Sequence, residues 1–222
     1  MRLSVALVLV LLVGVVPLCS QEGGQDPKPV LYVIGTSHLD SNWNWTVQDS
    51  IRQFIPPTFF DNFKLFETYP HYNLNYEGVI HYMWFKEYHP EAWPTVQKYV
   101  ADGRWRLSGS WINAVDVNVP SPESLMRQAL YGKRFFRQEF QKTSQDVYLP
   151  DCFGFGFALP SIAAHSGLSA FSTQKLTWGS SVPIPFPIGR WKGVDGSVVV
   201  AALNPGSYST RIRSDVSTDP KR

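Results

Sequence analysis

One histidine and two aspartates stand at the ends of segments with strand character in this 222-residue sequence. His38 ends "VLYVIGTSH" with Asp40 just after it, and Asp151 ends "QDVYLPD". In an extended backbone, residues two apart turn their side chains to the same side. Burying unpaired carboxylates is costly, and a divalent cation removes that cost. One imidazole with carboxylate oxygens suits zinc or a similar ion, so we predict a metal site made by these three residues.

Each of the three residues also has a structural interpretation. A lone H-x-D pair recurs by chance, and an aspartate such as Asp151 is more often a helix N-cap or a turn residue. Their joint placement favours a site, because ligands of alternating strand–helix folds bind beyond the carboxyl ends of the strands.

Other residues are candidates for ligand contact. Asp116 and Asn118 are again two apart, beyond a third strand-like segment. Turn polarity and capping explain them as well as hydrogen bonding to sugar hydroxyls does, so both interpretations stay open. Trp43 and Trp45 are most economically core residues. The alternative places one of these two rings at the floor of a pocket.

The composition narrows the class of protein. The net charge is +2 with few charge blocks, so nothing indicates a nucleic-acid partner. The 8 Trp, 10 Tyr and 14 Phe suit a large core, and also a sugar site, where a flat ring packs on a pyranose. Without the first twenty residues, Cys152 is a lone cysteine that cannot form an internal disulfide. We interpret it as a small buried apolar residue.

The N-terminus has the pattern of a targeting segment. Arg2 precedes the apolar stretch "LSVALVLVLLVGVVPL", and Ser20 is a suitable small residue for cleavage. The stretch is short for a spanning helix, so we expect removal and export rather than a stable membrane span. Residues 1–20 are therefore predicted as a signal peptide and 21–29 as a polar linker.

Strand-like and helix-like segments alternate in the rest of the chain. Expected strands cover 30–38, 72–78, 105–111, 145–151, 169–176 and 196–203. Expected helices cover 49–70, divided at Pro56 and Pro57, then 90–104, 121–141 with Ser121 as N-cap, and 158–167. The alternation predicts an α/β fold with a mostly parallel sheet.

Four segments resemble one known family, in the family's order. They are "HLDSNW", "DVNVPSPESLMRQALYG", "YLPDCFGFGFALP" and "GRWKGVDGSVVV". They resemble the H-x-D-x-x-W, D-x-N-x-P-S-x-E-S-x-x-R-Q, P-D-x-F-G and W-x-G-x-D-G-S motifs of glycoside hydrolase family 38, the retaining α-mannosidases. The resemblance spans about residues 30 to 206. It implies that residues 30–222 are an incomplete, mostly parallel, β/α barrel-like catalytic domain of the family's N-terminal type.

The resemblance assigns roles by motif. His38, Asp40 and Asp151 resemble ligands of one Zn²⁺ ion, and Asp151 resembles the catalytic nucleophile as well. Trp43 resembles the ring beneath the bound mannose. Asp116 and Asn118 fall in a segment that lines the substrate.

The resemblance also implies a reaction. Terminal α-mannosyl residues would be hydrolysed from a mannose-containing oligosaccharide or glycoprotein glycan by double displacement, with zinc bound to the 2- and 3-hydroxyls of the sugar. The family's second histidine ligand and its acid/base aspartate come from sequence beyond Arg222. We therefore expect an N-terminal fragment of a larger enzyme, with no activity alone.

Two other functions compete with this one. A metal-dependent polysaccharide deacetylase on a related barrel would carry an H-x-x-x-H pair, which the sequence lacks. A non-catalytic, secreted sugar-binding protein would have no use for Asp151 as a nucleophile. The remaining histidines lack ligand spacing and are expected on the surface or satisfied in the core: His71, His81, His89 and His165.

Overall fold

A computed structural model describes residues 35–177 and 184–203. The predicted signal peptide (1–20) and linker (21–29) lie outside these residues, as does most of the first expected strand. Among the described helices, none is long and apolar enough to cross a membrane.

The first sheet is parallel and has the order β1-β2-β3. Its strands are β1 (Gly35–Ser37), β2 (Leu74–Tyr76) and β3 (Trp105–Leu107). Ser37 pairs with Tyr76, and Tyr76 pairs with Leu107, so the three strands end level with one another. The residues that follow these strands therefore emerge at one edge of the sheet.

The second sheet has the order β4-β5-β7-β6. Its strands are β4 (Asp146–Tyr148), β5 (Ala170–Thr173), β6 (Ile188–Lys192) and β7 (Val198–Leu203). β4, β5 and β7 are parallel, whereas β6 is antiparallel to β7. The two sheets meet beyond β3, where the backbone N–H of Ser110 donates to the carbonyl of Asp146 at 2.9 Å. The predicted α/β class and mostly parallel pairing are confirmed, and β6 is an additional strand.

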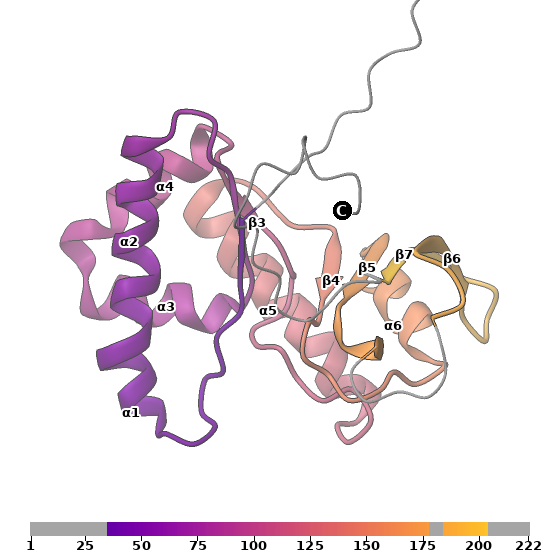
Figure 1. Cartoon of the computed structure of the whole chain (residues 1–222). Helices are drawn as coiled ribbons and strands as arrows, with labels where there is room; N and C mark the ends of the chain where they lie inside the picture. Colours follow the sequence, from indigo (N-terminus) through magenta and orange to yellow (C-terminus); the bar gives the residue numbers. More distant parts are fainter. Residues whose placement is uncertain (1–34, 178–183, 204–222) are drawn as a thin grey trace, which may run out of the picture. The chain divides into compact units, whose positions relative to one another are not determined.

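In the part of the chain that the structure describes, six α-helices connect and cover the strands. They are α1 (Val47–Asp49), α2 (Ile55–Thr68), α3 (Val79–Tyr88), α4 (Trp93–Ala101), α5 (Pro122–Phe140) and α6 (Leu159–His165). Shorter turns are η1 (Ser50–Phe54, π-helical), η2 (Pro90–Ala92) and η3 (Lys175–Thr177). α2, α3 and α4 lie beside the first sheet, α6 lies beside the second, and α5 contacts helices of both groups (Figure 1).

The expected division of the helix at 49–70 takes a different form. Pro56 and Pro57 occupy the first turn of α2, the part of a helix that tolerates proline best. The residues on both sides of the junction keep right-handed helical dihedrals, so residues 47–68 stay helical and only the hydrogen-bond pattern changes from π to α. The prolines thus mark the start of α2 without separating two helices in space.

Helix α3 was not expected from the sequence. It begins after Gly78, whose φ of 84° favours glycine, and a Cβ there would meet the imidazole of His81 at 2.6 Å. Several of its residues are buried, including Val79, Tyr82 and Phe85. Because adjacent positions 81 and 82 are both buried, the segment lacks the clear polar and apolar faces that identify a surface helix.

Within residues 35–177 and 184–203, the buried hydrophobic side chains form two clusters. The first is rich in aromatic rings and lies between α2, α3 and the first sheet, where Phe59 stacks on Phe85 with centroids 4.0 Å apart. The second is largely aliphatic and includes Val147, Phe171 and Val199 from the second sheet. The expected aromatic core therefore exists, and it belongs mainly to the first sheet.

The predicted helix ends agree with the structure at two places. The Ser121 Oγ accepts a hydrogen bond from the backbone N–H of Ser124 at 3.2 Å, which caps α5. Gly167 has a φ of 70° and follows the end of α6. α5 thereby starts just after the segment that holds Asp116 and Asn118.

Candidate active site

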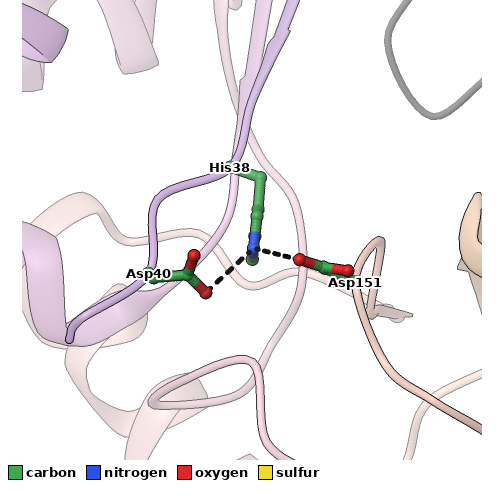
Figure 2. Close-up of side chains that lie close together, drawn as sticks. All are labelled: His38, Asp40 and Asp151. Carbon is green, nitrogen blue, oxygen red and sulfur yellow. Dashed lines mark ion pairs between the residues drawn. The ribbon is translucent and has the colours of Figure 1, made fainter. Parts of the chain in front are cut away.

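His38, Asp40 and Asp151 come together at the carboxyl ends of β1 and β4 (Figure 2). The His38 Nε2 lies 3.6 Å from an Asp40 carboxylate oxygen and 3.9 Å from an Asp151 carboxylate oxygen. Figure 2 shows the imidazole between the two carboxylates, which approach it from different loops. One ligand atom from each residue lies within 4.8 Å of the others, a spacing that could hold a metal ion.

The strands explain why these residues meet. His38 is the first residue after β1, Asp40 lies in the loop that follows, and Asp151 lies three residues beyond β4. Strands with a common direction deliver their following loops to the same side of the fold. The direction of the strands therefore brings these three residues together, although Asp151 lies far from His38 and Asp40 in the sequence.

The donor set fits a metal ion on two counts. The His38 Nε2 is buried and has no hydrogen-bond partner within the described residues, although a buried polar nitrogen normally has one. Bond lengths near 2.1 Å place tetrahedral zinc ligands about 3.4 Å apart, close to the separations of Nε2 from Asp40 and Asp151. A cation between the three groups would supply the missing partner.

The other imidazole nitrogen of His38 has a strong partner. The His38 Nδ1 lies 2.7 Å from a carboxylate oxygen of Glu77, and the Glu77 side chain is only 2% exposed. Burial opposes a positive charge on His38, but the Glu77 hydrogen bond and the nearby carboxylates outweigh it and raise the pKa of His38. Burial raises the pKa of Glu77, because it disfavours the ionised carboxylate, and the hydrogen bond to His38 counteracts part of this effect.

Asp151 has a second charged neighbour. The Lys175 ammonium forms an ion pair with one Asp151 oxygen, while the other oxygen is the one nearest His38. Lys175 is 8% exposed, and its ammonium also lies 4.8 Å from the centre of the Phe153 ring. The two oxygens of Asp151 thus have different environments, one facing the imidazole and the other facing a cation.

A buried polar network holds the loop after β1. The Ser50 Oγ donates to the carbonyl of Ser41 at 2.8 Å and accepts from the Trp45 indole at 2.8 Å. The Ser41 hydroxyl lies 3.2 Å from the His81 Nε2, and the Tyr76 hydroxyl lies 3.1 Å from the His81 Nδ1. Burial lowers the pKa of His81 to about 4, so this imidazole is neutral near pH 7. The expectation of a satisfied core histidine is confirmed for His81.

Trp43 does not belong to the core. Its side chain is 71% exposed, so the core interpretation was wrong for this residue. It lies three residues beyond Asp40, in a loop whose inward positions are occupied by smaller polar groups such as Ser41. Trp45 is half-buried and packs on Phe54 with ring centroids 4.6 Å apart. The Trp43 ring meets Trp45 edge-on with centroids 5.8 Å apart, and most of its surface stays exposed.

Asp116 and Asn118 are both exposed and make the contacts of a turn. The backbone N–H of Asn118 donates to an Asp116 carboxylate oxygen at 2.8 Å. The Asn118 amide also approaches the loop after β4, since a Cβ on Gly154 would lie 3.1 Å from its Nδ2. Turn formation accounts for Asp116, while Asn118 reaches the loop that carries Asp151.

Cys152 is 5% exposed, and its thiol donates to the carbonyl of Val115 at 3.1 Å. Burial raises the pKa of this thiol to about 12, so no thiolate forms near pH 7. Its interpretation as a small buried residue is confirmed.

Comparison with known proteins decides the family. The family model described as "Glycosyl hydrolases family 38 N-terminal domain" matches residues 28–221. The chain belongs to glycosyl hydrolase family 38. The sequence is 33% identical over 176 residues to alpha-mannosidase G of Dictyostelium discoideum, and 32% identical over 192 residues to an alpha-mannosidase of Saccharomyces cerevisiae.

These alignments cover 79% and 86% of this chain, but only 16% and 18% of the two relatives. The chain therefore spans less than a fifth of their length. The crystal structure of an alpha-mannosidase from Enterococcus faecalis superimposes with a TM-score of 0.69 and 23% identity, covering 79% of this chain and 20% of that one. This likeness supports the fold of the family 38 domain.

The segment "WKGVDGS" contains an aspartate that bonds to a neighbouring helix. Asp195, within "WKGVDGS", accepts hydrogen bonds from the Ser161 hydroxyl and the His165 Nε2, both at 2.6 Å, and from the backbone N–H of Ser197 at 3.0 Å. These bonds, led by that from Ser161, lower the pKa of Asp195. They attach the turn between β6 and β7 to α6. His165 is thus a surface histidine with a partner, as expected.

Two residues of the candidate site were not expected from the sequence, namely Glu77 and Lys175. Glu77 directly follows β2, and Lys175 lies two residues beyond β5. The expected strands 72–78 and 169–176 enclosed both residues, whereas the observed strands end before them. Neither forms a recognisable short motif, which is why they were overlooked.

Proposed function

We propose that the protein carrying this chain is a zinc-dependent, retaining α-mannosidase. It would hydrolyse terminal α-mannosyl residues from mannose-containing oligosaccharides or glycoprotein glycans. The observation that carries the proposal is the buried His38 Nε2, which lacks a hydrogen-bond partner in the described residues and faces Asp40 and Asp151. The names of the family 38 relatives support the substrate class.

His38, Asp40 and Asp151 would hold the Zn²⁺ ion. When bound, the ion would supply a positively charged docking point for two neighbouring hydroxyls of the sugar. The protein groups do the remaining positioning. Trp43 would place its exposed ring beneath the mannose, while Asp116 and Asn118 would line the substrate from the turn before α5.

Asp151 would act as the nucleophile. One carboxylate oxygen bonds to the anomeric carbon as the glycosidic C–O bond breaks, and the leaving oxygen takes a proton from a second carboxylic acid. Water then attacks the same carbon, gives its proton to the second carboxylate, and releases Asp151 and the mannose. The Lys175 ammonium contacts one Asp151 oxygen and leaves the other on the side of His38.

We also propose export of the protein, directed by residues 1–20. This rests on the apolar stretch after Arg2 and the small residue Ser20. N-terminal sequencing of secreted protein would test it, since a mature chain that still begins at Met1 would contradict the proposal.

The full-length protein that contains this domain tests the activity. We expect release of nitrophenol from 4-nitrophenyl α-mannoside, loss of release after chelation, and recovery with zinc. Proton NMR of the first product should show the α-anomer. The deacetylase alternative predicts acetate release from an acetylated polysaccharide with the mannoside untouched, and that result would refute the proposal.

A further inference from the structure

We propose that Glu77 is a positioning residue for the metal site. Through its hydrogen bond, it fixes the tautomer and ring orientation of His38, so that the Nε2 presents its lone pair to the metal. The inference rests on the proposed function only in taking His38 as a metal ligand.

The sheet places the two residues side by side. Ser37 of β1 pairs with Tyr76 of β2, and His38 and Glu77 are the next residues along these parallel strands. Their side chains meet at 2.7 Å between the His38 Nδ1 and a Glu77 oxygen. The contact therefore follows from the strand register and does not depend on a flexible loop.

Glu77 is built into the interior. Its side chain is 2% exposed, and a Cβ on Gly109 would lie 3.1 Å from the Glu77 Cβ. Within the described residues, the Glu77 side chain makes one hydrogen bond, and that bond is to His38. Burying a carboxylate is costly, and an apolar side chain at this position would avoid the cost. The hydrogen bond to His38 therefore explains why a carboxylate occupies this position.

The chemistry of imidazole gives that contact a consequence. A neutral imidazole carries one N–H and one lone pair, and an ionised carboxylate can only accept a hydrogen bond. The Nδ1 must then carry the proton, which leaves the lone pair on the Nε2. That nitrogen is the one that faces Asp40 and Asp151 and lacks a hydrogen-bond partner in the described residues. A carboxylate behind a metal-binding histidine also raises its basicity as a ligand.

The first measurement is zinc affinity, by competition with a chromophoric chelator. Glu77→Gln keeps the size of the side chain but offers an amide that can donate to the Nδ1 as well as accept from it. We expect affinity to fall ~10–100-fold. The matched control is Glu87→Gln on the exposed side of α3, which removes the same charge and should change affinity less than twofold. Equal affinities for folded Glu77→Gln and the control would overturn the proposal.

A double variant separates positioning from general loosening of the fold. If Glu77 acts through His38, Glu77→Gln should have no further effect on zinc affinity in a His38→Gln background. A full additive loss in that background would show that Glu77 acts elsewhere and would contradict the proposal. Far-UV circular dichroism and a denaturant midpoint establish that each variant is folded.

The second measurement needs no variant. Nitrogen-15 NMR of histidine-labelled, zinc-free protein at pH 8 reports which nitrogen of His38 carries the proton. We expect the Nδ1–H form, and a predominant Nε2–H form would overturn the proposal even if Glu77→Gln failed to fold. Neither measurement uses a mannoside, so a failure of the proposed mannosidase activity would be recognised separately.

Discussion

On the β1 side of the candidate site, the loop beyond the His38–Glu77 contact is held by buried neutral hydrogen bonds, whereas on the β4 side Asp151 pairs with a cation. Ser50 donates a hydrogen bond to the Ser41 carbonyl, and His81 forms one with the Ser41 hydroxyl. Both side chains are fully buried. Asp151 instead has the Lys175 ammonium, and Phe153 beside it is 79% exposed. The loop after β1 is therefore preorganised by the core, while the proposed nucleophile lies in a more open segment and is held by an ion pair.

The comparison predicts different consequences for each side. Changes to Asp151 or Lys175 should alter the charge balance of the site, and with it turnover or the effect of zinc on stability. Changes to His81 or Ser50 should act on stability, and reach the metal through the loop.

The largest effect is expected for Asp151→Asn in the full-length protein. The amide keeps the shape of the side chain but is a far poorer nucleophile, so turnover of 4-nitrophenyl α-mannoside should fall at least ~10³-fold. The matched control is Asp61→Asn on the exposed face of α2. Turnover within tenfold of wild type would show that Asp151 is not the nucleophile.

The next largest effect concerns pH and His81. The folded pKa is about 4 and the ordinary value is 6.5, so the unfolded chain binds more protons between these two pH values. The free energy of unfolding should therefore fall by roughly 3 kcal/mol as the pH drops from about 6.5 to about 4.

Denaturant titrations of wild type and His81→Gln at several pH values measure this effect. The amide can still bond to Ser41 and Tyr76 but does not titrate, so the variant should lose less stability over that window. Subtracting the two curves removes the contribution of His38, whose raised pKa has the opposite sign. Parallel curves for the two proteins would contradict a strongly lowered pKa of His81.

Lys175→Met tests the charge on the β4 side. Removing the ammonium takes away the cation that contacts the half-buried Asp151 and leaves it beside His38 and Asp40. We expect a loss of about 2 kcal/mol in the free energy of unfolding without zinc, and a smaller loss when zinc neutralises Asp151. Lys64→Met, whose side chain is 73% exposed, is the control. Equal losses with and without zinc would mean that Lys175 and the metal do not share Asp151.

Ser50→Ala should have the smallest effect. It removes the hydroxyl that donates to the Ser41 carbonyl and accepts from the Trp45 indole, at a cost of about 1–2 kcal/mol in the free energy of unfolding. Because this loop carries Asp40, zinc affinity should fall a few-fold as well. Ser124→Ala, on an exposed turn of α5, should leave zinc affinity unchanged. Unchanged affinity in Ser50→Ala would show that the metal site tolerates a loosened loop.

Much of the fold followed from local sequence patterns. Hydrophobic spacing identified α2 and α5, and Ser121 identified the start of α5, because caps and helical periodicity act over a few residues. α3 was missed since buried polar and apolar positions are adjacent in it. β6 was missed as well, and its pairing with β7 runs against the predicted parallel direction.

For the site, the sequence by itself determined the grouping of His38, Asp40 and Asp151. Parallel strands deliver their carboxyl ends to one side, so recognising the strands was enough. Only the tertiary structure decided that Glu77 lies behind His38, that Lys175 pairs with Asp151, and that the Trp43 ring is exposed. The physical reason is that these features depend on strand register and on packing between segments far apart in the chain, which local spacing does not encode.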